Sequence, residues 1–213
     1  MDRYQETFQT WNKVALLYQE KFMHLDLYNA SYDFFCAMFT QNNTRILEIG
    51  CGPGNITHYL LQKRPDFDIL GIDVAPKMIE LAQANNPTAR FEVFDCRQLD
   101  CLKMKFDAIV SGFCLPYLSQ QDCQKLIADS LLLLNQNGII YLSFVADDPQ
   151  KSNYQTGSSG DRTFFYYHTL QDVLDLLASH RFAIVQLFTV SYLKTGRETE
   201  EHTIVIAKLH EVV

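Results

Sequence analysis

The stretch RILEIGCGPGN, residues 45–55, decides the fold. Its first five residues are mostly apolar, as in a strand that is buried on both faces, and three glycines then follow within five residues. Gly50, Gly52 and Gly54 form a G-x-G-x-G pattern, which allows a tight turn and lets a ligand approach the main chain without a Cβ in the way. We therefore predict a strand, a glycine loop and a helix over residues 55–63.

The same alternation of short apolar runs and helical segments continues along the chain. We predict helices at 76–85, from Ser119 onward and at 169–179, and further strands at 68–74, 90–95, 106–113, 138–145, 182–190 and 202–209. Strands separated by helices indicate a parallel sheet that is covered on both faces. The last two strands have no helix between them, so we expect them to pair antiparallel. The predicted fold class is α/β, a doubly wound sheet of seven strands, mostly parallel with an antiparallel C-terminal strand.

The N-terminal region differs from this pattern. Apolar residues at alternating spacings of three and four predict an amphipathic helix over residues 6–25, and a second, aromatic-rich helix is predicted over 27–39. A polar stretch over 147–168 is predicted to be a long loop, and such loops are commonly functional. We expect a single domain over residues 1–213, organised as an N-terminal helical cap at 1–42, a ligand-binding core at 45–145, a substrate loop at 147–168 and a C-terminal helix and strand pair at 169–213.

Composition limits the possible partners. The 213 residues carry a formal net charge of −7 without any cluster of Lys and Arg, which argues against a nucleic-acid-binding surface. The six cysteines form no C-x-x-C pair and follow no basic-apolar leader, which is typical of reduced cytosolic thiols. No apolar stretch approaches the roughly 20 residues of a membrane helix. We expect a cytoplasmic protein with a small-molecule partner, no nucleic acid, no membrane and no metal.

Acidic residues lie at the ends of the next two predicted strands. Asp73 follows the glycine loop by about 20 residues, where an acidic side chain commonly binds the hydroxyls of a ribose. Val74 and Met78 offer an apolar wall for a base, and Asp95 offers an acceptor for an exocyclic amine. Each carboxylate alone also fits a solvated strand end, but their joint placement favours an adenosine site. Asn55 stands where the dinucleotide fingerprint has its third glycine, which disfavours a nicotinamide-dependent oxidoreductase.

The successive motifs ILEIGCGPGN, GIDVAPKMIELA, FEVFDCRQL and FDAIVSGFCLPYL resemble those of the class I S-adenosylmethionine-dependent methyltransferases, in the same order and spacing. The resemblance covers residues 45–145 and is to small-molecule members, of the methyltransferase-domain 11 and 25 type. It implies a Rossmann-like fold and S-adenosyl-L-methionine as the cofactor. It also implies cofactor contacts from the methionine end to the adenine, at Tyr18, Glu48, Gly50, Cys51, Gly52, Ser111, Phe113, Asp73, Val74, Met78, Asp95 and Cys96.

The resemblance also bears on the acceptor. SGFCLPYL lacks the Asn-Pro-Pro-aromatic or Asp-Pro-Pro-aromatic motif of the members that methylate amino groups in nucleic acids. It implies in-line methyl transfer to a small molecule, with the acceptor atom left open. The alternative is a non-catalytic protein of the same fold that binds S-adenosylmethionine as a regulator or assembly partner.

Residues for the acceptor are predicted only from residue type. Tyr18 on the first helix offers a hydroxyl to the methionine end, with core packing as the alternative interpretation. Tyr117 and His168 are the candidate catalytic residues, since a general base is needed if the acceptor holds its proton at neutral pH. The candidate substrate-binding residues are aromatic or imidazole side chains: Tyr28, Tyr117, Tyr154, Tyr166 and His168. The acidic segment ETEE at 198–201 is expected to be a solvated loop.

Overall fold

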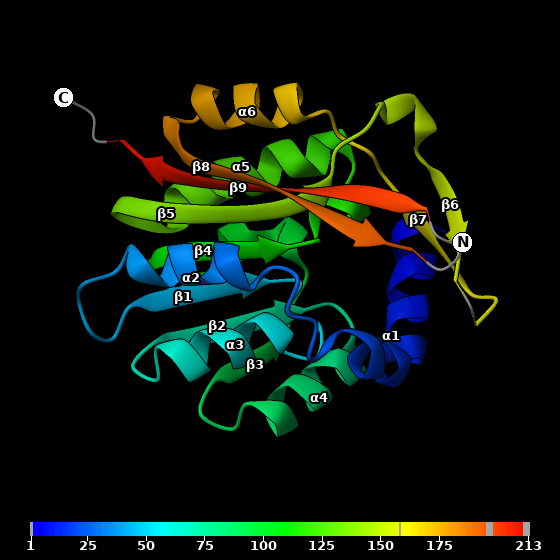
Figure 1. Ribbon diagram of the computed structural model, residues 1–213, viewed down its shortest axis with the longest axis horizontal. Coiled ribbons are helices and arrows are strands. Elements are labelled where there is room, and N and C mark those ends of the chain that lie inside the picture. Colours follow the sequence, from blue (N-terminus) through cyan, green and yellow to red (C-terminus); the bar gives the residue numbers. More distant parts are fainter. Residues whose placement is uncertain (1, 158, 195–197, 211–213) are drawn as a thin grey trace.

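The computed structural model describes residues 2–157, 159–194 and 198–210. The strands of its main sheet are β1 Arg45–Ile49, β2 Asp68–Asp73, β3 Arg90–Val93, β4 Phe106–Gly112, β5 Leu134–Val145, β8 Phe182–Leu193 and β9 Thr199–Leu209. They lie in the order β3-β2-β1-β4-β5-β9-β8 (Figure 1). Strands β1 to β5 are parallel, and β9 runs antiparallel between β5 and β8. The predicted doubly wound sheet, with its antiparallel C-terminal strand, is confirmed.

Helices cover both faces of this sheet. Their bounds are α1 Arg3–Phe22, α2 Asn29–Ala37, α3 Asn55–Lys63, α4 Pro76–Asn85, α5 Gln120–Leu133 and α6 Leu170–Ser179, with short 3-10 turns η1 Cys96–Cys101, η2 Leu115–Tyr117 and η3 Pro149–Lys151. One apolar cluster joins the sheet to α2 and α3, and another joins it to α5 and α6. Helix α1 lies beyond the carboxyl ends of the parallel strands (Figure 1). The order of β2, β1, β4 and β5 reverses between β1 and β4, so a ligand is expected under α1.

Local sequence signals explain where the central elements begin. The side chain of Ser119 accepts a hydrogen bond from the Asp122 amide and caps α5, as the sequence predicts. Pro76 occupies the first turn of α4, but Ala75 before it has no side chain that can cap the helix. Asn12 of α1 supplies the missing cap, because its Oδ1 accepts a hydrogen bond from the Lys77 amide at 2.8 Å. The N-terminal helix thus fixes the start of α4.

The predicted bounds of the first two helices are wrong at their ends. Helix α1 begins three residues before the predicted residue 6 and ends at Phe22, and α2 starts at Asn29. The connection between them forms turns, with Leu25 facing the cavity that is described below. The helical spacing of apolar residues extends past the end of α1, because Leu25 in the following turn faces the same cavity as the apolar side of the helix.

The polar stretch over 147–168 is not the long loop that the sequence predicts. It contains η3 and a two-stranded hairpin of β6 Asn153–Thr156 and β7 Arg162–Phe165. The hairpin packs on α1, where the Phe164 amide donates to Thr7 Oγ1 at 3.1 Å and Arg162 pairs with Glu6. Residue 158 lies outside the described residues. Polar composition concealed the hairpin, because its stability comes from contacts with a distant helix.

The expectation for the ETEE segment is also wrong. Thr199 to Glu201 belong to β9, and the Glu200 side chain is only 17% exposed. Residues 195–197 of the preceding polar connection lie outside the described residues. Within the described part of the chain, no helix is long and apolar enough to cross a membrane.

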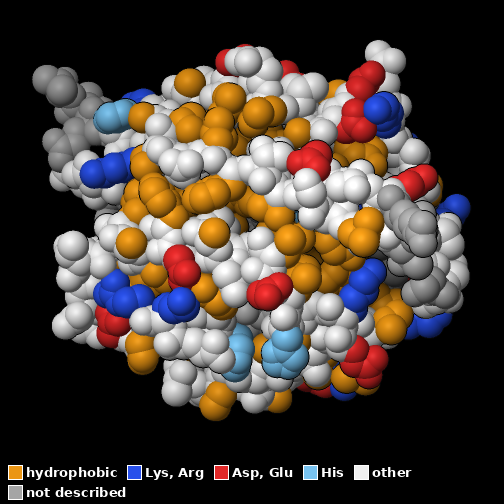
Figure 2. All heavy atoms as spheres, viewed as in Figure 1, with side chains coloured by type: hydrophobic (Ala, Val, Ile, Leu, Met, Phe, Trp, Pro, Cys, Tyr) orange, Lys and Arg blue, Asp and Glu red, His pale blue; other side chains and the backbone are white. Residues whose placement is uncertain are grey.

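Apolar side chains remain exposed along the edge strand β8. Ile184, Val185, Leu187 and Leu193 are between 38% and 67% exposed. Figure 2 shows apolar side chains gathered in the upper half of this view, where β8 and β9 run in Figure 1. The opposite edge of the sheet ends in the short strand β3.

Gly54 of the glycine loop is a position where an added side chain should destabilise the fold. Gly54 has φ of +79°, and a Cβ added there would lie 2.5 Å from Asn86 Nδ2 and 3.3 Å from Ala82. Gly160 has a similar φ of +81°, but no described atom lies within 4 Å of an added Cβ. We expect Gly54→Ala to lower the free energy of unfolding by about 3 kcal/mol and Gly160→Ala by only about 1 kcal/mol. Urea denaturation of both variants measures this, and equal losses would show that Asn86 adjusts freely.

Candidate active site

A cavity of about 290 Å³ lies at the carboxyl ends of the parallel strands. Its walls come from the glycine loop, the ends of β2 and β4, the residues after β3, the apolar face of α1 and the start of β9. The described lining includes Glu48, Asp73, Asp95 and Glu200 but no Lys or Arg. The described lining is therefore largely aromatic and apolar, and its titratable groups are mostly acidic.

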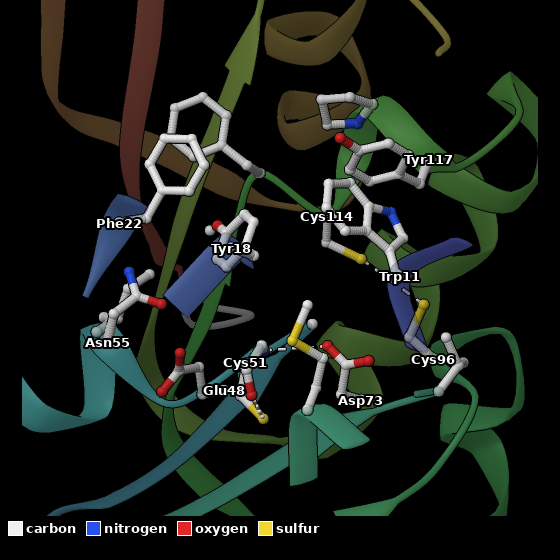
Figure 3. A pocket seen from close by; sticks show the side chains of 18 of the residues that line it. Trp11, Tyr18, Phe22, Glu48, Cys51, Asn55, Asp73, Cys96, Cys114 and Tyr117 are labelled. Atoms are coloured by element: carbon white, nitrogen blue, oxygen red, sulfur yellow. Dashed lines mark hydrogen bonds between the residues drawn. The ribbon is translucent and has the colours of Figure 1, made fainter. Parts of the chain in front are cut away.

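Asp73 holds the glycine loop in shape. Its Oδ2 accepts a hydrogen bond from the Gly52 amide at 3.0 Å, and its Oδ1 accepts one from the Ala75 amide at 2.9 Å. Burial raises the pKa of the carboxyl, while these amides oppose that shift. Figure 3 shows Asp73, Cys51 and Glu48 on one side of the cavity, with Tyr18 and Trp11 across from them. Asp73 thus links the ends of β1 and β2 and faces the cavity.

Glu48 is a buried carboxyl with one unused oxygen. It is 1% exposed, the Thr57 hydroxyl donates to its Oε2, and its Oε1 has no hydrogen-bond partner among the described residues. Burial raises its pKa to about 8, although the Thr57 bond opposes the shift. An acidic group held neutral beside an open cavity is suited to a cationic ligand that restores its charge.

Asp95 is already neutralised by the chain itself. Its carboxylate caps η1 through the Arg97 amide and binds the Arg97 guanidinium, with an Nη2–Oδ2 distance of 2.6 Å. Val74, Met78 and Cys96 line the cavity beside it, as the sequence predicts. Cys96 Sγ lies 3.9 Å from Cys114 Sγ, and both are free thiols. Asp95 therefore lines the part of the cavity that is predicted to hold the adenine, and its salt bridge with Arg97 fixes the position of its carboxylate.

Aromatic residues of α1 form the roof of the cavity. Trp11 stands edge-on to Tyr18 at 5.5 Å and to Tyr117 at 5.2 Å between ring centroids. A Cβ on Gly52 would lie 3.7 Å from the Tyr18 ring, so Tyr18 faces the glycine loop. Burial raises the pKa of the Tyr18 and Tyr117 hydroxyls, so both are neutral donors at physiological pH. Tyr18 lies at the cavity rather than only in the core.

The sequence around this cavity is similar to that of known methyltransferases. Residues 46–138 match the family model for a methyltransferase domain. Over these residues the chain is similar to the methyltransferase-domain family. It is 32% identical over 112 residues to putative methyltransferase 235L of Invertebrate iridescent virus 6. The aligned stretch covers 53% of this chain and 40% of that relative. It is 35% identical over 95 residues to a trans-aconitate 2-methyltransferase of an Enterobacter species, 45% of this chain and 36% of the relative.

Solved structures share the fold of this chain. A methyltransferase of Methanosarcina mazei aligns with a TM-score of 0.70 and 20% identity, covering 83% of this chain and 98% of that one. A 1,6-didemethyltoxoflavin-N1-methyltransferase of Burkholderia thailandensis aligns with a TM-score of 0.73 and 16% identity, covering 97% and 88%. The matched stretches span less than half the length of the curated relatives named above. The fold is therefore the Rossmann-like one that the motifs predict.

Four predicted site residues lie away from the cavity lining. Ser111 is fully buried, and its Oγ has no partner among the described residues. Tyr154 packs on Phe164 within the hairpin, and Tyr166 faces a second, separate hollow. The His168 ring nitrogen Nε2 bonds to backbone oxygens of η2 and its neighbour at 3.1 Å, and burial lowers its pKa. These positions do not support Tyr154, Tyr166 or His168 as acceptor residues.

The aromatic run 164–168 faces mostly away from the cavity. Phe165 alone of the run lines the cavity, whereas the second hollow, between the hairpin and α5, is lined by Phe164, Tyr166, Tyr167 and His168. Tyr28 and Tyr117 line the cavity, as predicted. His24 is exposed and does not line it.

Sequence reasoning missed the part of the site at the start of β9. Glu200 and His202 line the cavity, together with Tyr192 of β8. Glu200 and His202 are two residues apart in one strand, so both side chains point to the same face. The alternation was visible in the sequence, but only the pairing of Val145 with His202 places that face at the carboxyl ends of the parallel strands.

Proposed function

We propose that this chain binds S-adenosylmethionine in the cavity and transfers its methyl group by in-line displacement to a small-molecule acceptor. One observation carries the proposal: Glu48 and Asp73 end two adjacent strands on either side of the glycine loop, and Glu48 keeps a buried oxygen without a partner among the described residues. A ribose has hydroxyls that suit the ionised Asp73, and an amino acid has an ammonium that suits Glu48. The donor set thus fits a cofactor with both groups.

The remaining lining residues are assigned along the same cofactor. Gly50, Cys51 and Gly52 hold the methionine portion through their backbone, with Tyr18 above them. Val74 and Met78 flank the adenine, and Asp95 with the Cys96 backbone meets its amino edge. Phe113 borders the methyl, whereas the buried Ser111 supports β4 behind it.

The cofactor supplies a methyl group that is activated by its bond to a sulfonium sulfur. The chain's own residues orient the acceptor in line with that bond and exclude water. The aromatic roof of α1 and the hairpin covers the reacting groups. The free oxygen of Glu48 and the carboxylate of Asp73, in a described lining without Lys or Arg, favour a cationic cofactor over an anionic one. A general base is needed for methyl transfer only if the acceptor atom is still protonated at neutral pH.

The small-molecule acceptor is supported by the size and closure of the cavity. A trans-aconitate 2-methyltransferase and a 1,6-didemethyltoxoflavin-N1-methyltransferase among the similar proteins carry small-molecule names, whereas a release factor glutamine methyltransferase of Streptococcus pneumoniae carries that of a protein substrate. A fold neighbour described as a [4+2]-cyclase shows that the fold also hosts other chemistry. We place the protein in the cytoplasm, in keeping with its six free cysteines.

Calorimetry with S-adenosylmethionine, S-adenosylhomocysteine and NAD tests the proposal. We expect the first two to bind and NAD not to bind, because the cavity contains carboxylates and no cation for a pyrophosphate among its described residues. Binding of NAD alone would overturn the proposal. Binding of S-adenosylmethionine without methyl transfer to thiol, phenol, amine or carboxylate acceptors would favour a regulatory protein.

A further inference from the structure

Three polar side chains form a connected group at the end of the cavity that is farthest from Asp95 in the strand order. Tyr28 Oη lies 2.7 Å from His202 Nδ1, and His202 Nε2 lies 3.6 Å from Glu200 Oε1. All three residues line the cavity. They come from the turn before α2 and from β9, so none belongs to the glycine loop or to the strands that hold the proposed cofactor site.

The neighbours of Tyr28 determine the direction of its hydrogen bond. Burial raises the pKa of the Tyr28 hydroxyl, and surrounding hydroxyl and carboxyl groups raise it further, so the phenol is neutral at physiological pH. A neutral phenol can donate to an imidazole nitrogen or accept from its N–H. The ring proton of His202 is assigned to Nε2, because that nitrogen faces the Glu200 carboxylate at 3.6 Å, and this leaves Nδ1 to accept from Tyr28.

The carboxylate of Glu200 is ionised. Burial opposes its ionisation, but the His202 and Lys194 side chains hold the pKa of the carboxyl below its usual range. Lys194 forms an ion pair with Glu200. Tyr192 stacks on the His202 ring at 5.0 Å and Phe113 meets its edge at 4.8 Å, so the imidazole is held in place on both sides. The group has the form of a proton relay that ends in a fixed negative charge.

The composition of the cavity limits what can use such a relay. The described lining contains no Lys or Arg that would bind a carboxylate or phosphate acceptor. An anionic acceptor would find no cationic partner in the described lining, while the rings of Phe113, Tyr192 and Phe165 favour a flat aromatic one. A neutral phenol satisfies both conditions, and it must lose its proton to become a good nucleophile.

We propose that the methyl acceptor is a neutral phenol and that Tyr28, His202 and Glu200 remove its proton. The acceptor O–H donates to Tyr28 Oη as the Tyr28 proton passes to His202 Nδ1. The acceptor oxygen then uses the electron pair of the broken O–H bond to form a bond to the methyl carbon, and the pair of the sulfur–carbon bond returns to sulfur. The products are an aryl methyl ether, a neutral thioether and an imidazolium paired with Glu200. The inference rests on the proposed function.

The binding of 4-nitrophenol to the complex with S-adenosylhomocysteine tests this relay without turnover. The absorbance of nitrophenolate reports how far the bound phenol is ionised. We expect the ratio of phenolate to phenol to be at least about tenfold higher for the bound compound than for the free compound at the same pH, which corresponds to one pKa unit. His202→Gln and Tyr28→Phe should remove that increase, and His180→Gln, at the end of α6 and away from the cavity, should keep it.

Several outcomes would overturn the relay. An unchanged phenolate fraction in His202→Gln is one, and binding of 4-nitrobenzoate or 4-nitrobenzylamine in place of 4-nitrophenol is another. Calorimetry with S-adenosylhomocysteine on the same proteins separates the two proposals. If the wild type fails to bind S-adenosylhomocysteine, the proposed function fails. If every variant binds S-adenosylhomocysteine with equal affinity and the phenolate fraction is the same in His202→Gln as in the wild type, only the relay fails.

Nitrogen-15 NMR of the histidine side chains provides a test that requires no stable variant of His202. The relay requires the wild-type ring to carry its proton on Nε2, with the Nδ1 resonance of a hydrogen-bond acceptor. Tyr28→Phe removes the donor and should shift that Nδ1 resonance alone among the histidines. A proton on Nδ1 in the wild type would overturn the relay, because that nitrogen has no lone pair for a proton.

Discussion

Asp73→Ala is expected to weaken the binding of S-adenosylmethionine by about 10- to 150-fold. The change removes a charged acceptor from the ribose site, an effect of about 1.5–3 kcal/mol. It also leaves the Gly52 and Ala75 amides without their present acceptor, so the glycine loop loses a constraint on its shape. Isothermal titration calorimetry on wild type and variant measures the ratio of the dissociation constants.

Asp68→Ala is the matched control for this experiment. Asp68 begins the strand that Asp73 ends, and its carboxylate is exposed and paired with Arg90 at 2.9 Å. Exposed ion pairs contribute little to stability, and this one lies at the far end of the strand from the cavity. We expect the control to bind S-adenosylmethionine like the wild type. Equal affinity of both variants would refute the placement of the ribose at Asp73.

Glu48→Gln is expected to stabilise the free protein at high pH and to weaken the binding of S-adenosylmethionine. The raised pKa of Glu48, about 8, means that the folded protein keeps this proton to a higher pH than the unfolded chain does. Ionisation therefore costs stability as the pH rises from about 4.5 to 8, and no such cost exists below about 4.5. Glutamine cannot ionise, so the variant should exceed the wild type by about 2–4 kcal/mol at pH 8 and match it near pH 4.

The same carboxyl should exchange its proton for the ligand. At pH 7 the free protein holds Glu48 mostly neutral, and pairing with the ammonium of the cofactor ionises it. Calorimetry in two buffers of different ionisation enthalpy should therefore show proton release in the wild type and none in Glu48→Gln. The variant should bind about 10- to 150-fold more weakly, since it loses a charged hydrogen bond. Binding without proton release in the wild type would contradict the neutral state of Glu48.

The residues of the proposed cofactor site could be predicted because most of them lie at or after the end of a strand that is recognisable from its own stretch of sequence. Each strand end carries its own signal: Glu48 and the glycines at β1, Asp73 at β2 and Asp95 at β3. Parallel strands bring all these ends to one edge of the sheet, so a correct order of elements places the residues together. The alternation of apolar runs likewise determined the sheet, since a parallel strand is buried on both faces.

The acceptor half was not predictable in the same way. Its side chains come from the turn before α2, the hairpin and the start of β9, which meet only through long-range packing. His168 was misplaced because a run of aromatic residues does not show which of them face inward. His202 was missed because the sequence of β9 does not reveal that its first residues pair with the end of β5.

The antiparallel course of β9 has a consequence for how such a protein can change during evolution. Because β9 runs against its neighbours, its first residues lie at the same edge where β1 to β5 end. The residues around the proposed cofactor, apart from those of α1, form one continuous stretch of the chain, from Glu48 to Phe113, and those around the proposed acceptor flank it on both sides. Substitutions at the cavity-facing positions of either flank can alter the proposed acceptor site while that stretch stays unchanged. Acceptor specificity can therefore diversify without loss of the proposed cofactor site.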